Sequence, residues 1–206
     1  MRKIMYTAVL MASAIMLQAQ TQQTRNLNQK KAEKNTAAAS QDLSRESSTD
    51  VKNWQSDYHT ALASLKAAER HLRANRLSEI EKLTLEADQL ILPLIDSHPQ
   101  NSEIRLLKAY SHILRMAVNP AEKYVTEGRL ARQILYGAQH IDPQNPRFDL
   151  MRAQLEYYYL KDKNTDKNIR YLFERAAENL KKYKPATPQH PTWGLEDTSY
   201  YLSIIK

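Results

Sequence analysis

Histidine is the residue type in this chain best suited to bind a metal or to exchange a proton near neutral pH. The histidines never form the His-Glu-x-x-His pattern, which places two metal ligands and a base on one helix face. None has a glutamate three residues before it, as helical di-iron sites require. The six are His59, His71, His98, His112, His140 and His190. Their spacing predicts no metal site and no bound cofactor.

Other catalytic patterns are missing from the sequence as well. The chain has no cysteine and no Gly-x-Ser-x-Gly turn, and its glycines at positions 128, 137 and 194 are too few for a phosphate-binding loop. Carboxylate pairs such as Glu79 with Glu81, or Glu86 with Asp88, stand two residues apart and point in different directions on a helix, where we expect solvated charge. We therefore expect no catalytic residue and no enzyme, although carboxylates that converge from distant helices would leave no motif.

Composition indicates the kind of elements that must position these residues. Hydrophobic residues make up 42% of the 206, enough for a packed core, and three glycines are too few for a turn-rich β fold. The formal net charge is +7, of which two bases fall in residues 1–19 and a surplus of two falls in residues 20–48, leaving +3 for the remainder. A surplus this small does not make the basic face that nucleic acid requires, so we expect no nucleic-acid partner.

The N-terminus has the parts of an export signal. Arg2 and Lys3 precede an apolar run that ends at Leu17, and Ala19 marks a plausible cleavage point. The run is shorter than the roughly 20 residues that span a bilayer, although an uncleaved anchor stays an alternative. The sequence predicts a signal peptide over 1–19, a polar tether over 20–48 and one helical domain over 49–206. The ending Leu-Gln-Ala-Gln resembles Gram-negative signals, which implies a periplasmic or secreted protein with no membrane span after cleavage.

Apolar residues recur at steps of three and four through the rest of the chain, as amphipathic helices require. The spacing predicts helices over about 51–72, 78–95 and 102–118, then from 120, from 146, over 169–183, and a last one from 192. Ser78 and Glu81 form a capping-box pattern, and Pro93 is expected to kink or shorten the second helix. Seven helices joined by short loops predict an all-α fold of antiparallel hairpins.

A spaced signature repeats three times along these hairpins. A small residue is followed by apolar residues four and seven positions on and by a proline twelve positions on. The three instances are Ala87, Ile91, Leu94, Pro99; Ala131, Leu135, Ala138, Pro143; and Ala176, Leu180, Tyr183, Pro188. This pattern resembles the second helix of the tetratricopeptide repeat (TPR), which implies a TPR-like right-handed array or short α-solenoid of about seven helices, capped near Trp193. An ordinary helical bundle stays an alternative.

The resemblance also implies which side chains a concave face would present. In the register of the repeat these are Glu103, Tyr110, Arg147, Gln154, Tyr157 and Tyr158. Tyrosine and arginine are favoured where a partner segment docks, and the alternative is that the tyrosines pack between hairpins. The sequence therefore predicts an exported TPR-like scaffold that binds a peptide or partner protein. The alternatives are a helical small-ligand carrier or enzyme with a central pocket, and a spacer with neither groove nor pocket.

Overall fold

The computed structural model describes residues 54–160, 167–185, 187 and 190–205. Every regular element in these ranges is helical, so the all-α fold class is confirmed. The expected signal peptide and tether lie outside the described residues. Among the described helices, none combines the length and the hydrophobicity that a membrane crossing needs.

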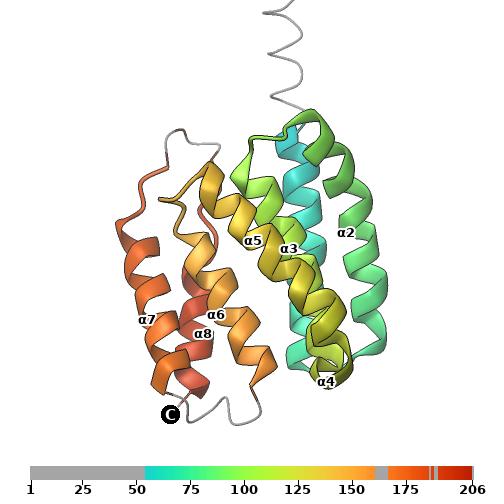
Figure 1. The fold of residues 1–206 in the computed structure, drawn as a ribbon, viewed down its shortest axis with the longest axis vertical. Helices are drawn as coiled ribbons and strands as arrows, with labels where there is room; N and C mark the ends of the chain where they lie inside the picture. The colour runs from blue at the N-terminus through green and yellow to red at the C-terminus, as the bar shows by residue number, and fades with distance from the viewer. Residues whose placement is uncertain (1–53, 161–166, 186, 188–189, 206) are drawn as a thin grey trace, which may run out of the picture. The chain divides into compact units, whose positions relative to one another are not determined.

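The helices follow one another through short connections (Figure 1). The first helix occupies residues 54–73. The others are α2 (Ser78–Ser97), α3 (Ser102–Val118), α4 (Pro120–Lys123), the π-helical turn η1 (Tyr124–Gly128), α5 (Arg129–Ile141), α6 (Arg147–Tyr159), α7 (Lys167–Lys182) and α8 (Leu195–Ile204). Because α4, η1 and α5 follow one another without a break, the described chain forms seven helical segments.

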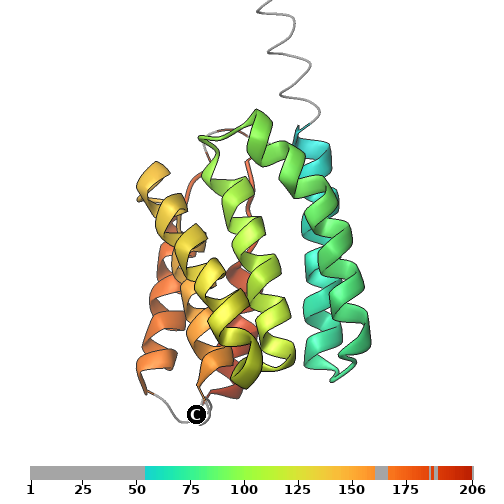
Figure 2. The same ribbon diagram turned by 45° about the vertical axis from the view of Figure 1, so that its right-hand side comes forward.

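Helix α3 is the centre of the domain. Thirteen of its 17 residues are buried, and it packs against α2, α5 and α6. Helix α6 in turn packs against α7, and α7 against α8. Figures 1 and 2 show the first helix and α2 as a hairpin on one side of α3, and α6 with α7 on the other. Such stacking buries the apolar stripe of each hairpin against its neighbour.

The repeat signature marks packing positions in α2, α5 and α7. Its small and apolar members within these helices are buried, among them Ala87, Ala131 and Ala176 at 0% exposure. Tyr183 differs, because α7 ends at Lys182 and leaves Tyr183 in the loop that follows, partly exposed. The helices therefore pack through the predicted residues, while the last member of the third repeat lies outside the helix.

Three local predictions need correction. Ser78 makes no capping hydrogen bond, because it is the first residue of α2 and Leu77 stands at the N-cap position. Pro93 lies inside α2 and does not end it, since the helix continues to Ser97. Asp88 is not solvated charge: it is 6% exposed and pairs with Lys108 at 2.9 Å. The helix positions were predictable, but the pairing of Asp88 depends on Lys108 of α3, which the pattern of α2 alone does not show.

The chain turns into α8 at Gly194. This residue has φ of +119°, a backbone conformation that side-chain-bearing residues rarely adopt. Just before it, Trp193 stacks on Tyr110 of α3 with ring centroids 6.0 Å apart and donates from Nε1 to the Tyr58 hydroxyl at 2.8 Å. Trp193 was expected to cap the end of an array, and it instead joins the C-terminal segment to the interior faces of the first helix and α3.

Candidate functional site

The six side chains predicted to face a partner are buried. Glu103, Tyr110, Arg147, Gln154, Tyr157 and Tyr158 are between 0% and 8% exposed. The repeat register placed them on a shared face of α3 and α6, but the C-terminal segment with Trp193 and Tyr201 packs against that face. These side chains therefore belong to the interior and do not line an open groove.

One part of this interior is organised by Glu69 of the first helix. Its carboxylate accepts hydrogen bonds from the hydroxyls of Tyr110 at 2.5 Å and Tyr201 at 2.7 Å, and from Gln154 Nε2 at 3.0 Å. Arg73 completes the group with a guanidinium nitrogen 2.8 Å from Glu69. We call these five residues the Glu69 cluster; it ties together the first helix, α3, α6 and α8.

A second interior group forms around Glu103 at the start of α3. Its carboxylate accepts hydrogen bonds from Arg147 at 2.8 Å, Asn145 at 2.7 Å and the Tyr58 hydroxyl at 3.1 Å. Arg147 is fully buried and also donates to the backbone carbonyl of Pro191. These contacts fix the loop before α6 against the start of α3 and against the C-terminal segment.

The two buried carboxylates differ in their proton affinity. Burial raises the pKa of Glu103 above its usual range, by more than the Arg147 guanidinium lowers it. Burial acts in the same direction on Glu69, but the charges of Lys66 and Arg73 hold the pKa of Glu69 below its usual range. Glu69 is therefore an ionised structural anchor, and it lines neither of the cavities described next.

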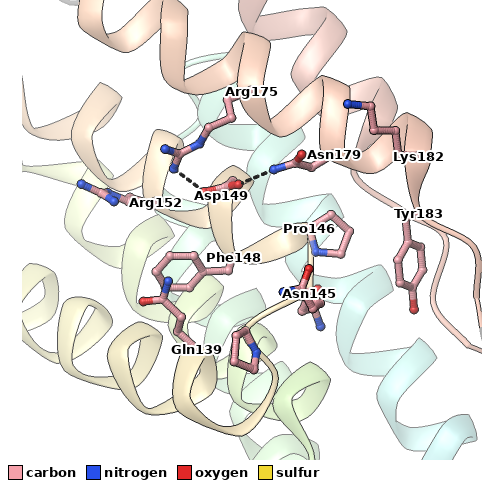
Figure 3. A pocket seen from close by; sticks show the side chains of 12 residues that line it. Gln139, Asn145, Pro146, Phe148, Asp149, Arg152, Arg175, Asn179, Lys182 and Tyr183 are labelled. Carbon is pink, nitrogen blue, oxygen red and sulfur yellow. Dashed lines mark hydrogen bonds and ion pairs between the residues drawn. The ribbon is translucent and has the colours of Figure 1, made fainter.

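A cavity of about 600 Å³ opens between α6, α7 and the loop that precedes α6. We call it the α6–α7 cavity. Figure 3 shows Phe148 on one side of it and Tyr183 on the other, with Lys182 and Arg152 at its edge. Its lining thus combines aromatic side chains with cations, a combination that suits a flat ligand with acidic substituents.

One carboxylate in the α6–α7 cavity is already engaged. Asp149 accepts a hydrogen bond from Arg175 and another from Asn179 Nδ2 at 2.8 Å (Figure 3). This pairing compensates the Asp149 charge and fixes α7 against α6. Arg152, one turn further along α6, lies exposed at the edge of the same cavity.

A second cavity, of about 460 Å³, lies where α3 begins and α5 ends. We call it the Trp54 cavity. It is lined by Trp54 from the first helix, by Glu103, and by Tyr183, Lys184 and His190 from the segment after α7. The two cavities share Tyr183, and both volumes fall within the roughly 300–1,000 Å³ of small-molecule sites.

Sequence reasoning did not single out these cavity residues. Tyr183 was noticed only as the second apolar member of the third repeat instance, and His190 only as one of six histidines without a metal-binding pattern. The available signal was the size of Tyr183: the other two instances have Leu94 and Ala138 at this position, and a large ring there does not fit the same close approach of helices. The structure places this ring between two cavities.

Comparison with known proteins adds one structural likeness. No protein-family model and no curated protein matches the chain. A solved structure, the HusA haemophore from Porphyromonas gingivalis, is similar with a TM-score of 0.59 and 24% sequence identity, covering 74% of each chain. The likeness confirms the helical fold, and the narrower tetratricopeptide assignment stays a prediction.

The prediction of a protein-binding scaffold is wrong on these findings. The structural neighbour is a haemophore, the name of a small-ligand carrier, and the side chains expected to form a binding groove are buried. The alternative interpretation from the sequence was a helical small-ligand carrier or enzyme with a central pocket, and its carrier part agrees better with the neighbour. The two cavities around Tyr183, which aromatic side chains, cations and one histidine line, are the candidate site.

Proposed function

We propose that this chain is an exported carrier of a planar, carboxylate-bearing tetrapyrrole of the haem class. The ligand would bind at the loop end of the helical domain, in the two cavities that share Tyr183. The observation that carries the proposal is the position of Tyr183, whose ring forms a wall of both cavities. Around it the structure gathers aromatic surfaces, cations and a histidine.

The aromatic side chains account for recognition of a flat ring. Phe148 lines one cavity and Trp54 the other, with Tyr183 between them. Aromatic side chains give large contact areas and favour stacked or edge-on contacts with other rings. A conjugated macrocycle that contacts Tyr183 would replace water on several of these surfaces at once, which is favourable because apolar area leaves water.

The charges at the edge of the site account for the acidic substituents. Arg152 and Lys182 border the α6–α7 cavity, and Lys184 borders the Trp54 cavity. Because these three side chains are exposed, they can pair with the ligand's carboxylates while the ring lies deeper. To pair with the ligand, Lys182 gives up its ion pair with Glu178. This loss costs little free energy, because both groups are exposed.

The fold and the export signal support the same function. The similar structure belongs to a haemophore, and a carrier that meets haem outside the cytoplasm must be exported. The N-terminal sequence has the parts of a secretory signal, which supports export to a compartment where such a ligand would be met.

The proposal is tested by titrating the purified exported protein with haemin and with metal-free protoporphyrin IX. The chain has two tryptophans, so quenching of their fluorescence reports binding. Saturable quenching at micromolar concentrations of both porphyrins is expected, and Trp54→Ala should weaken the binding of both, because it removes an aromatic surface of the Trp54 cavity. Failure of both porphyrins to bind would contradict the proposed function.

A further inference from the structure

His190 is the one histidine of the six that lines either cavity. It lies in the segment after α7, in the lining of the Trp54 cavity, together with Tyr183 and Trp54. Haem iron is held in proteins by an axial side chain, most often a histidine and in some cases a tyrosine, cysteine or methionine. The position of His190 therefore allows it to contact the iron of the proposed ligand as well as the ring.

The ring of His190 is oriented by Thr187. Its Nδ1 lies 2.9 Å from the Thr187 hydroxyl, and its backbone N–H donates to the Thr187 carbonyl at 3.0 Å. Among the described residues, no hydrogen bond uses the other ring nitrogen, Nε2. In metal-bound histidines the ring nitrogen away from the metal usually donates to an oxygen, which fixes the tautomer and the ring plane. Thr187 supplies such an oxygen.

We infer that Nε2 of His190 is the axial iron ligand of the carrier, with Nδ1–H donating to the Thr187 hydroxyl. The inference rests on the proposed function and names the contact that distinguishes haem from a metal-free porphyrin. His190 touches the iron, and Thr187 acts through His190 as a positioning residue.

His140 provides a matched control on the same chain. Its Nδ1 also has an oxygen partner, the backbone carbonyl of Tyr136 at 2.8 Å, so its ring is oriented in a comparable way. It differs in place, because it is exposed on α5 and lines neither cavity. A comparison of His190→Ala with His140→Ala therefore separates the cavity position from the mere presence of an oriented imidazole.

The experiment records absorption and electron paramagnetic resonance spectra of the ferric haemin complex and measures affinity for haemin and for metal-free protoporphyrin IX. In His190→Ala we expect the spectrum of histidine-ligated iron to be lost and haemin affinity to fall at least about tenfold, while affinity for the metal-free ring stays unchanged. Thr187→Val should weaken haemin binding less, and Thr187→Ser should restore it. Imidazole added to His190→Gly should restore the wild-type spectrum.

The outcomes separate the two proposals. If both porphyrins bind and His190→Ala retains the wild-type haemin spectrum, or if His140→Ala loses it, ligation by His190 is wrong and the carrier function stands. If neither porphyrin binds the wild-type protein, the carrier function is wrong and ligation by His190 falls with it. A variant that loses the haemin spectrum but keeps its helical circular dichroism and its affinity for protoporphyrin IX supports the inference.

Discussion

The hydroxyl of Tyr201 lies 2.7 Å from the carboxylate of Glu69, although 132 residues separate the two along the chain. This hydrogen bond joins the C-terminal helix α8 to the first helix of the domain. Both side chains are almost completely buried, and burial raises the pKa of Tyr201 well above its usual range, so its hydroxyl remains a donor. The Glu69 cluster therefore closes the fold by holding its two ends together.

Removal of the Glu69 charge is expected to destabilise the domain strongly. In Glu69→Gln the half-buried Arg73 guanidinium loses its partner at 2.8 Å and keeps only Asp197 at 3.6 Å, and loss of one member of a buried ion pair costs up to about 3–5 kcal/mol. Tyr201→Phe removes hydrogen bonds to Glu69, Gln154 and Tyr158 but leaves the ion pair in place, and it should cost about 1–3 kcal/mol. Urea unfolding followed by circular dichroism measures both changes as a shift in midpoint.

The control for this comparison is Glu178→Gln on α7. Glu178 pairs with Lys182 at the surface, where water screens both charges, so no measurable change in stability is expected. A loss from Glu178→Gln as large as that from Glu69→Gln would show that burial does not set the strength of these pairs.

Two helical glycines should respond in opposite directions to alanine. At Gly128 an added Cβ would lie 2.7 Å from the Tyr124 ring and 2.8 Å from the Met116 sulfur, so Gly128→Ala is expected to cost about 1–3 kcal/mol. At Gly137 a Cβ would meet nothing within 4 Å, and Gly137→Ala should stabilise α5 by about 0.5–1 kcal/mol. Thermal unfolding of the two variants beside the wild type measures the sign of each effect, and equal signs would contradict the packing at η1.

The stability of the domain should fall as the pH drops through the range in which free histidine titrates. Burial lowers the pKa of His112 below its usual range, and the Arg115 charge acts in the same direction, against the effect of the hydrogen bond to the Glu127 carboxylate. Below a pH of about 6.5 the unfolded chain therefore binds a proton that the folded chain resists, and stability is lost with falling pH. Unfolding in urea at pH 7.5 and 5.5 measures the loss.

His112→Gln isolates this contribution from those of the other histidines. The variant is expected to be less stable at pH 7.5, because the hydrogen bond between His112 and the Glu127 carboxylate is lost. Its stability should change less between the two pH values, because glutamine does not titrate. An unchanged pH dependence in His112→Gln would show that another group carries the effect.

Periodicity predicted which residues pack but not what covers them. The apolar steps located α3 and α6, and the small residues of the repeat signature, such as Ala131, are buried as expected. The same register placed Tyr110 and Gln154 on one face, but the partner that covers this face is Tyr201 of α8, far along the chain. The apolar periodicity of a helix predicts which of its faces is buried. It does not predict which later segment packs against that face.

The cavities were beyond sequence reasoning for a related reason. Trp54 and Tyr183 stand at opposite ends of the domain's sequence and meet only because the first helix, α3 and α7 bring their ends to one edge. Trp54 belongs to no motif, and the repeat signature that includes Tyr183 predicted packing and not a binding site, since a site built from loop ends has no fixed spacing. His190 was correctly seen as isolated in the sequence, and its place in a cavity depends on the turn at Thr187.

Because Tyr183 lines both cavities, its removal is expected to weaken the binding of both porphyrins. Tyr183→Ala removes aromatic contact from both cavities and takes one of two aromatic neighbours from the Arg147 guanidinium, which lies 4.9 Å from the Tyr183 ring centre and 5.6 Å from that of Trp193. Loss of a central aromatic contact of this kind costs more than about 1.4 kcal/mol, so affinity for haemin and for protoporphyrin IX should each fall at least about tenfold. Tryptophan fluorescence quenching measures both affinities.

Tyr171 on α7 is the control for this prediction, because it is a tyrosine with a 59% exposed side chain that lines neither cavity. Tyr171→Ala should leave both affinities unchanged, since exposed aromatic surface away from the site loses nothing when the ligand binds. If Tyr183→Ala binds both porphyrins as tightly as the wild type, the ligand does not contact the wall between the cavities. If the two variants weaken binding equally, the ligand is held by general surface hydrophobicity and not by the site around Tyr183.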